Sequence, residues 1–171
     1  MNRKASLVPA LGAAIVLLTG GGTAIAASGS HRVPLGEGPS DLDASYCGFP
    51  VHIGIVADNE YLVQQIPQPD GSLYVLATGK LFESVTNTAT GKTIQINASG
   101  QQKDVFAPDG SISVASDGAL VLALTPAEQA QFNLPGLLLF TGHGTGTVNP
   151  NGSFSGINLD GNVTNLCAAV S

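Results

Sequence analysis

His143 is the residue whose setting best suits chemistry. It stands between Gly142 and Gly144, so little neighbouring side-chain bulk would keep a ligand from its imidazole ring. A histidine takes up and releases protons near neutral pH, which makes His143 a candidate general base or ligand contact. The simpler interpretation is a histidine on an exposed strand, and no catalytic role is therefore assigned.

His52 is the second candidate. It lies in the alternating stretch 51–55, on the face opposite to the apolar residues of that stretch. If its face lined a polar cavity, His52 and His143, with a carboxylate such as Asp58 or Glu60, would form a proton-transfer site or bind a metal ion. If the apolar face fills the interior, His52 lies outside. We favour the second arrangement and predict neither a metal site nor a cofactor.

Aromatic residues supply the other candidate ligand contacts. Tyr61 and Tyr74 flank the turn at 69–71 and are expected to face each other across one hairpin, as a packing pair or a ligand clamp. Phe140 and His143 complete the set of candidate ligand-binding residues. The chain has no tryptophan, so it offers few flat platforms on which sugars or nucleic-acid bases stack.

The first 27 residues have the pattern of a signal peptide. Arg3 and Lys4 precede an apolar stretch over 7–18, and small residues then allow cleavage after Ala26 or Ala27. The stretch is too short to span a bilayer. We expect a secreted protein, extracellular or associated with the cell envelope, that has no membrane contact once the signal is cleaved.

Charge limits the partners. The formal net charge is −6, and loss of Arg3 and Lys4 with the signal peptide makes it more negative. Such a surface repels phosphate backbones and anionic lipid. Nucleic acid is therefore not expected as a partner.

Two cysteines, Cys47 and Cys167, stand near opposite ends of the remaining chain. They lack the Cys-x-x-Cys spacing of a redox pair, so we expect one structural disulfide formed in an oxidising compartment. In the loop-entropy account, so long a loop is worth roughly 5 kcal/mol at most. Residues 28–46 are rich in glycine, proline, serine and acids, which predicts a flexible arm, and 47–171 is expected to be the folded domain.

Turn signals recur through this domain and predict short strands between them. Proline presets the first turn dihedral, Asp or Asn bonds its own backbone, and glycine adopts the positive φ that closes a tight reversal. Alternating apolar residues fill the intervals. The expected turns are Asp58-Asn59, Pro69-Asp70-Gly71, Thr90-Gly91, Pro108-Asp109-Gly110, Ser116-Asp117-Gly118, Pro150-Asn151-Gly152 and Leu159-Asp160-Gly161.

Two segments, 119–124 and 137–140, are apolar on both faces. They are either covered on both sides within the fold or form a contact surface, and we favour internal burial. In the second case they would present an apolar patch to a small apolar ligand or to a second copy of the chain, through Leu120, Leu122, Leu138 and Phe140.

These patterns predict an all-β protein with one short helix. Thr125-Pro126-Ala127-Glu128 has the form of a capping box, so the helix should run to about Phe132. A disulfide that joins the first strand to the last favours a single antiparallel β-barrel, because closure brings those strands together. The strand count is similar to calycin-like or allene-oxide-cyclase-like barrels, and a β-sandwich is the alternative.

One set of motifs runs through most of the predicted domain. It consists of Cys47-Gly48-Phe49-Pro50-Val51, Val85-Thr86-Asn87 before Thr90-Gly91-Lys92-Thr93, Ala98-Ser99-Gly100, Pro108-Asp109-Gly110 and the closing Gly161-Asn162-Val163-Thr164-Asn165-Leu166-Cys167. In these motifs the chain resembles small secreted proteins of actinobacteria. The resemblance implies export and a β fold and lends no catalytic residue.

We therefore expect a non-catalytic binding or interaction module for a small apolar ligand or a protein partner. A structural protein of the cell envelope is the alternative, favoured by low charge, a surface rich in Gly, Thr and Asn, and a disulfide. An isomerase or cyclase that uses a histidine at a barrel mouth ranks third, and it requires His52 and His143 to lie near one another.

Overall fold

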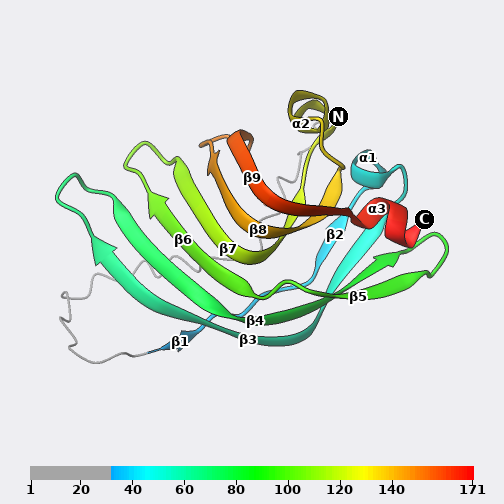
Figure 1. Ribbon diagram of the computed structural model, residues 1–171, viewed down its shortest axis with the longest axis horizontal. Coiled ribbons are helices and arrows are strands. Elements are labelled where there is room, and N and C mark those ends of the chain that lie inside the picture. Colours follow the sequence, from blue (N-terminus) through cyan, green and yellow to red (C-terminus); the bar gives the residue numbers. More distant parts are fainter. Residues whose placement is uncertain (1–31) are drawn as a thin grey trace, which may run out of the picture.

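The computed structural model describes residues 32–171, which form one antiparallel sheet with three short helices (Figure 1). The all-β class is thus confirmed, while the predicted signal peptide lies outside the described residues. The elements are β1 (Val33–Pro34), β2 (Ser40–Leu42), α1 (Ala44–Cys47), β3 (Val51–Pro67), β4 (Leu73–Asn87), β5 (Thr93–Asn97), β6 (Gly100–Phe106), β7 (Ile112–Ala123), α2 (Pro126–Phe132), β8 (Leu137–Val148), β9 (Phe154–Asn165) and α3 (Leu166–Val170).

The sheet has two ends. Its strand order is β1-β3-β4-β6-β7-β8-β9, β2 also pairs with β3, and β5 and β6 lie one after the other along β4. Within residues 32–171, no ladder joins β9 to the strands at the other end. The closed barrel, calycin-like or allene-oxide-cyclase-like, is therefore not confirmed, and Figure 1 shows a curved, open sheet.

Three of the predicted hairpin turns are confirmed and share one structure. Asp70, Asp109 and Asn151 each accept a hydrogen bond from the backbone N–H of a serine two residues later, at 2.9, 2.9 and 3.0 Å. The intervening glycines have φ of 84°, 87° and 83°, the left-handed conformation that closes each reversal. Thr90-Gly91 is also in a turn, between β4 and β5.

Three other predicted turns are wrong, because the residues concerned lie inside long strands. Asp58-Asn59 is in β3, Ser116-Asp117-Gly118 in β7 and Leu159-Asp160-Gly161 in β9. Two glycines of these segments, Gly118 and Gly161, belong to a row of directly paired glycines that crosses five strands. This glycine row is Gly79, Gly100, Gly118, Gly142 and Gly161.

The glycine row lets neighbouring backbones come close where the sheet bends. A Cβ added to Gly142 would lie 2.2 Å from the carbonyl oxygen of Asp160, and one added to Gly79 would lie 2.3 Å from that of Asn59. Glycine inside a strand marks a close approach or a sharp bend of this kind. Figure 1 shows that the long strands curve strongly along their length.

Both faces of the two-sided apolar strands are covered, as favoured from the sequence. Leu137 belongs to a first core cluster with Val51, Val85 and α3 residues, whereas Leu138 and Phe140 belong to a second cluster with Leu122. Burial on both faces makes these strands the centre of the fold.

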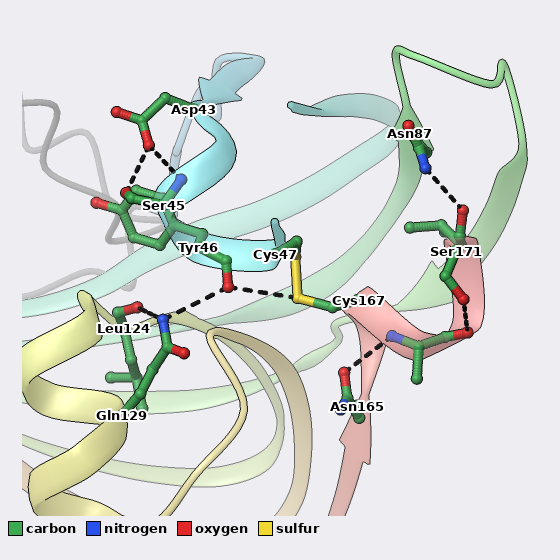
Figure 2. Close-up of a disulfide and its surroundings, with 12 residues drawn as sticks. Asp43, Ser45, Tyr46, Cys47, Asn87, Leu124, Gln129, Asn165, Cys167 and Ser171 are labelled. Carbon is green, nitrogen blue, oxygen red and sulfur yellow. Dashed lines mark hydrogen bonds between the residues drawn. A yellow bond between two sulfur atoms is a disulfide. The ribbon is translucent and has the colours of Figure 1, made fainter. Parts of the chain in front are cut away.

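The predicted disulfide joins α1 to α3 through Cys47 and Cys167. Figure 2 shows it beside the side chain of Gln129 of α2, which donates to the carbonyls of Tyr46 of α1 and Leu124. The side chain of Asn87 of β4 donates to the carbonyl of Val170 and so ties α3 to β4. The disulfide thus joins the segment between β2 and β3 to the segment after β9, where no β-ladder in residues 32–171 does.

The predicted helix is confirmed as α2. The side chain of Thr125 accepts from the N–H of Glu128, and the Glu128 carboxylate accepts from the N–H of Thr125 at 2.8 Å. Pro126 occupies the first turn, and Asn133, with φ of 54°, ends the helix. The other oxygen of Glu128 accepts from the N–H of Phe154 at 2.6 Å, which ties α2 to β9.

The segment expected to be a flexible arm is partly built into the fold. From residue 33 onward it supplies β1 and β2, both paired with β3, and then α1. Asp43 caps α1 by accepting from the N–H of Ser45. The composition of 28–46 does not predict these strands, because short edge strands pair through their backbones and need no alternation of apolar residues.

Candidate functional site

His143 lies on an exposed face of the sheet with an aspartate beside it. Its Nδ1 is 2.7 Å from Oδ1 of Asp117, the residue directly opposite on β7, and Asp160 stands opposite on β9. Lys103 approaches the other Asp117 oxygen at 3.8 Å. The hydrogen bond from His143 lowers the pKa of Asp117, and the charge of Lys103 adds to the effect. An aspartate on Nδ1 orients the ring and directs Nε2 outward.

A shallow groove begins beside this histidine–aspartate pair. It has a volume of about 380 Å³ and is open to solvent. Lys103 and Thr145 line it, and Gly156 places it against β9. Its other lining residues come from three adjacent strands, β6, β7 and β8, and are Val105, Ser113, Val114, Ala115, Gly146 and Thr147. Its volume lies within the range of small-molecule sites, but because it is open to solvent it would bury little of a compact molecule, whereas an extended segment can lie along it.

The two histidines are not brought together. His52 lies on β3 with Nδ1 at 2.8 Å from Asp41 of β2, and three strands separate β3 from β8, which carries His143. His52 points away from the core formed by Val51 and Ile53, as expected. Among residues 32–171, no three His, Cys, Asp or Glu side chains are placed to hold a metal ion.

The aromatic candidates do not form a ligand clamp. Tyr61 pairs with Thr78 and Tyr74 pairs with Ile66, so the two tyrosines are not opposite each other. The Tyr61 ring instead has the Arg32 guanidinium 5.9 Å from its centroid. The expected facing pair is wrong because the two tyrosines lie at unequal distances from the turn: Tyr61 is eight residues before it and Tyr74 three residues after it. A bulge in β3 also shifts the register of β3 and β4.

Phe140 and its neighbours fill the second core cluster. Phe140 and Leu138 are fully buried, Leu122 is buried and Leu120 is partly buried. The hollow beside them, lined by Leu120, Leu122, Ile157 and others, measures about 30 Å³. Small-molecule sites usually measure about 300–1,000 Å³, so the side chains already occupy the space that an apolar ligand would need.

One edge of the sheet has no strand partner among residues 32–171. β1 and β2 cover part of β3 at one end, but within the described chain β9 pairs only with β8. Natural edge strands are usually protected by lysine, proline or a covering element. β9 contains neither lysine nor proline, and the side chain of Val163 is left 41% exposed. Apart from the N–H of Phe154, which donates to Glu128 of α2, the outer backbone of β9 is thus available to pair with another strand.

Sequence reasoning missed a carboxyl cluster that Asp58 and Glu60 form with Glu37 and Glu83. The N–H groups of Glu37 and Glu60 both donate to Asp58, at 2.9 Å each. Burial, and then the charge of neighbouring carboxylates, raises the pKa of Glu37, Glu60 and Glu83 to about 7. The only sequence signal was Glu83 within an otherwise apolar face of β4.

Comparison of the chain with protein-family models, with curated proteins and with solved structures finds no match. Among residues 32–171, every helix is too short or too polar to cross a membrane.

Proposed function

We propose that this protein is a non-catalytic interaction module that binds an extended segment of a partner protein along β9. The observation that carries the proposal is the outer edge of β9, which has no strand partner among residues 32–171 and directly adjoins the groove lined by Lys103, Thr145 and Gly156. An extended segment that joins a sheet edge gains main-chain hydrogen bonds, and its side chains enter the adjoining surface.

The charge of the chain favours a basic or neutral segment. The chain has twelve acidic residues and only six lysines and arginines, and one of the acids, Asp160, lies on β9. Pairing of two β9 strands from two copies would bring like charges together, which disfavours a homodimer at low ionic strength. The partner segment is therefore expected to carry lysine or arginine near Asp160.

The small-ligand and enzyme alternatives have less support. The apolar hollow of about 30 Å³ is too small for a ligand of a few hundred daltons. The isomerase or cyclase hypothesis needs His52 and His143 near one another, and each instead has its own aspartate on a separate part of the sheet. The calycin-like or allene-oxide-cyclase-like barrel, which would enclose a lumen, stays a prediction.

The proposal places the module outside the cytoplasm, extracellular or associated with the cell envelope. The disulfide between Cys47 and Cys167 supports an oxidising compartment. The predicted signal peptide, residues 1–27, supports export.

A peptide-display selection with variants of two exposed valines tests the proposal. Val163→Lys places a charge on β9, and the matched control Val56→Lys places the same charge on β3, where the valine is 48% exposed against 41% at Val163. Random twelve-residue peptides are selected on the wild-type protein, and their Kd values are measured by fluorescence anisotropy.

We expect saturable binding of basic or neutral extended peptides, with a Kd at least tenfold weaker for Val163→Lys and unchanged for Val56→Lys. Selected peptides that bind both variants equally would place the binding surface elsewhere. Self-association that competes with every peptide would make a second copy the partner.

A further inference from the structure

The carboxyl cluster joins three parts of the chain. Glu37 belongs to the connection between β1 and β2, Asp58 and Glu60 belong to β3, and Glu83 belongs to β4. Asp58 holds this connection by accepting from the N–H of Glu37 at 2.9 Å, and the carbonyl of Glu60 accepts from the N–H of Leu35 at 2.9 Å. The segment 33–42 is thus fastened to β3 at the cluster.

Glu83 is the least satisfied member of the cluster. It is 7% exposed, and its Oε2 is buried and accepts no hydrogen bond within the described chain. Its cross-strand partners are the apolar Ile55 and Ile96. An ionised carboxylate in such a place is strongly unfavourable, whereas a protonated carboxyl group is tolerated.

No cation in the described chain neutralises the cluster. The nearby basic residues are engaged or turned away: Arg32 lies over the Tyr61 ring, and Lys80 is exposed on the face of β4 opposite to Glu83. None of the ion pairs in residues 32–171 involves these carboxyl groups, and none of the acids is placed to hold a metal ion. Protons are therefore the cations that suit this arrangement.

We propose that Glu37, Glu60 and Glu83 form, around the acceptor Asp58, a proton-controlled latch that fastens residues 33–42 to β3 and releases them when the three glutamates ionise. In the protonated state Glu37, Glu60 and Glu83 are neutral and do not repel one another. In the ionised state Glu37 is repelled by the acids of β3 and β4. Gly36 and Gly38 flank Glu37, and a Cβ on either would meet nothing within 4 Å, so the connection has room to move.

The direction of the pH dependence follows from the raised pKa values. A group whose folded-state pKa lies above its ordinary value stabilises the closed state at low pH, and this contribution is lost as pH rises. The ordinary value is 4.5, and burial raises the pKa of Glu37, Glu60 and Glu83 to about 7. The latch is closed near pH 4.5 and opens as pH rises through about 7.

Hydrogen exchange at single amides tests the latch. Protection factors, corrected for the intrinsic rate, are measured by NMR for the N–H groups of Leu35 and Glu37 between pH 4.5 and 8.5. Glu83→Gln removes the buried charge. Asp70→Asn is the matched control, because Asn151 already makes the same hydrogen bonds at the equivalent position of another turn.

In the wild type and in Asp70→Asn, we expect protection at both amides to fall at least tenfold with a midpoint near pH 7. In Glu83→Gln the midpoint shifts downward by at least half a pH unit, because the loss of one negative charge lowers the raised pKa of the remaining glutamates. If Glu83→Gln does not fold, Glu37→Gln, which replaces a partly exposed side chain, is expected to shift the midpoint in the same direction.

Equal protection at pH 4.5 and pH 8.5 in the wild type would overturn the latch, as would an unchanged midpoint in the folded Glu variant. Restoration of protection at pH 8.5 by millimolar Ca²⁺ would show that a metal ion, and not protons, holds the cluster.

Discussion

Replacing Gly142 by alanine tests the role of the glycine row in bending the sheet. The new Cβ would lie 2.2 Å from the carbonyl oxygen of Asp160 and 2.8 Å from the Cα of Gly161, whereas ordinary contact begins near 3.4 Å. Strands β8 and β9 therefore have to separate by about 1 Å in a close-packed structure. Gly142 also has φ of 150°, which an L side chain rarely adopts.

The cost combines two contributions. Backbone strain at such a φ costs about 1–3 kcal/mol, and overpacking costs about as much again. A loss of about 4 kcal/mol in the free energy of unfolding is therefore expected, against a total of about 5–15 kcal/mol for a domain. Thermal unfolding should show a Tm lower by about 8–16 °C.

Gly146→Ala is the matched control on the same strand and face. A Cβ there would lie 3.6 Å from Cγ1 of Ile157, an ordinary van der Waals contact. Its Tm should stay within about 4 °C of the wild type. Equal stability of the Gly142 and Gly146 variants in urea and thermal unfolding would refute the account of the glycine row.

Three further changes have expected effects on stability. Glu128→Ala removes the cap of α2 and the acceptor of the Phe154 N–H, so urea unfolding should show a loss of about 2–4 kcal/mol; a loss below 1 kcal/mol would contradict this. Burial raises the pKa of Asp104 from 3.8 to about 6, so the protonated Asp104 stabilises the folded state below pH 3.8, and this stabilisation is lost as pH rises through 6. The free energy of unfolding of Asp104→Asn, relative to that of the wild type, should therefore be about 2 kcal/mol higher at pH 8 than at pH 4. A difference between the two proteins that does not change with pH would contradict this. Replacement of Cys47 and Cys167 by alanine should cost about 3–5 kcal/mol, measured against the oxidised wild type, and an unchanged unfolding midpoint would argue against a stabilising disulfide.

The sequence predicted the parts of the fold whose cause is local. The Pro-Asp-Gly and Pro-Asn-Gly turns and the capping box at Thr125 are correct, because each depends on a few adjacent residues. The short strand lengths are wrong, because Asp117-Gly118 and Asp160-Gly161 were interpreted as turns. In a local sequence, an Asp-Gly pair at a tight turn and one at a bend inside a strand look the same, and only the cross-strand partner distinguishes them.

The candidate site could be predicted only in part. His143 was correctly identified as accessible, but its aspartate on β7 could not be found, since the pairing of β7 with β8 fixes it. The cluster around Glu83 depends on a connection between β1 and β2 that looked like a spacer. Contacts between residues far apart in the chain depend on register, which a single sequence does not specify.

The most direct test of the central claim is the hydrogen-exchange footprint of a selected peptide on the intact, oxidised protein. The account predicts that amides of β9 gain at least tenfold protection in the complex, with smaller gains along the groove near Lys103 and Thr145. Amides of β3 should not change. Protection confined to β3, or to the core strands with β9 still exchanging at its free rate, would contradict the account.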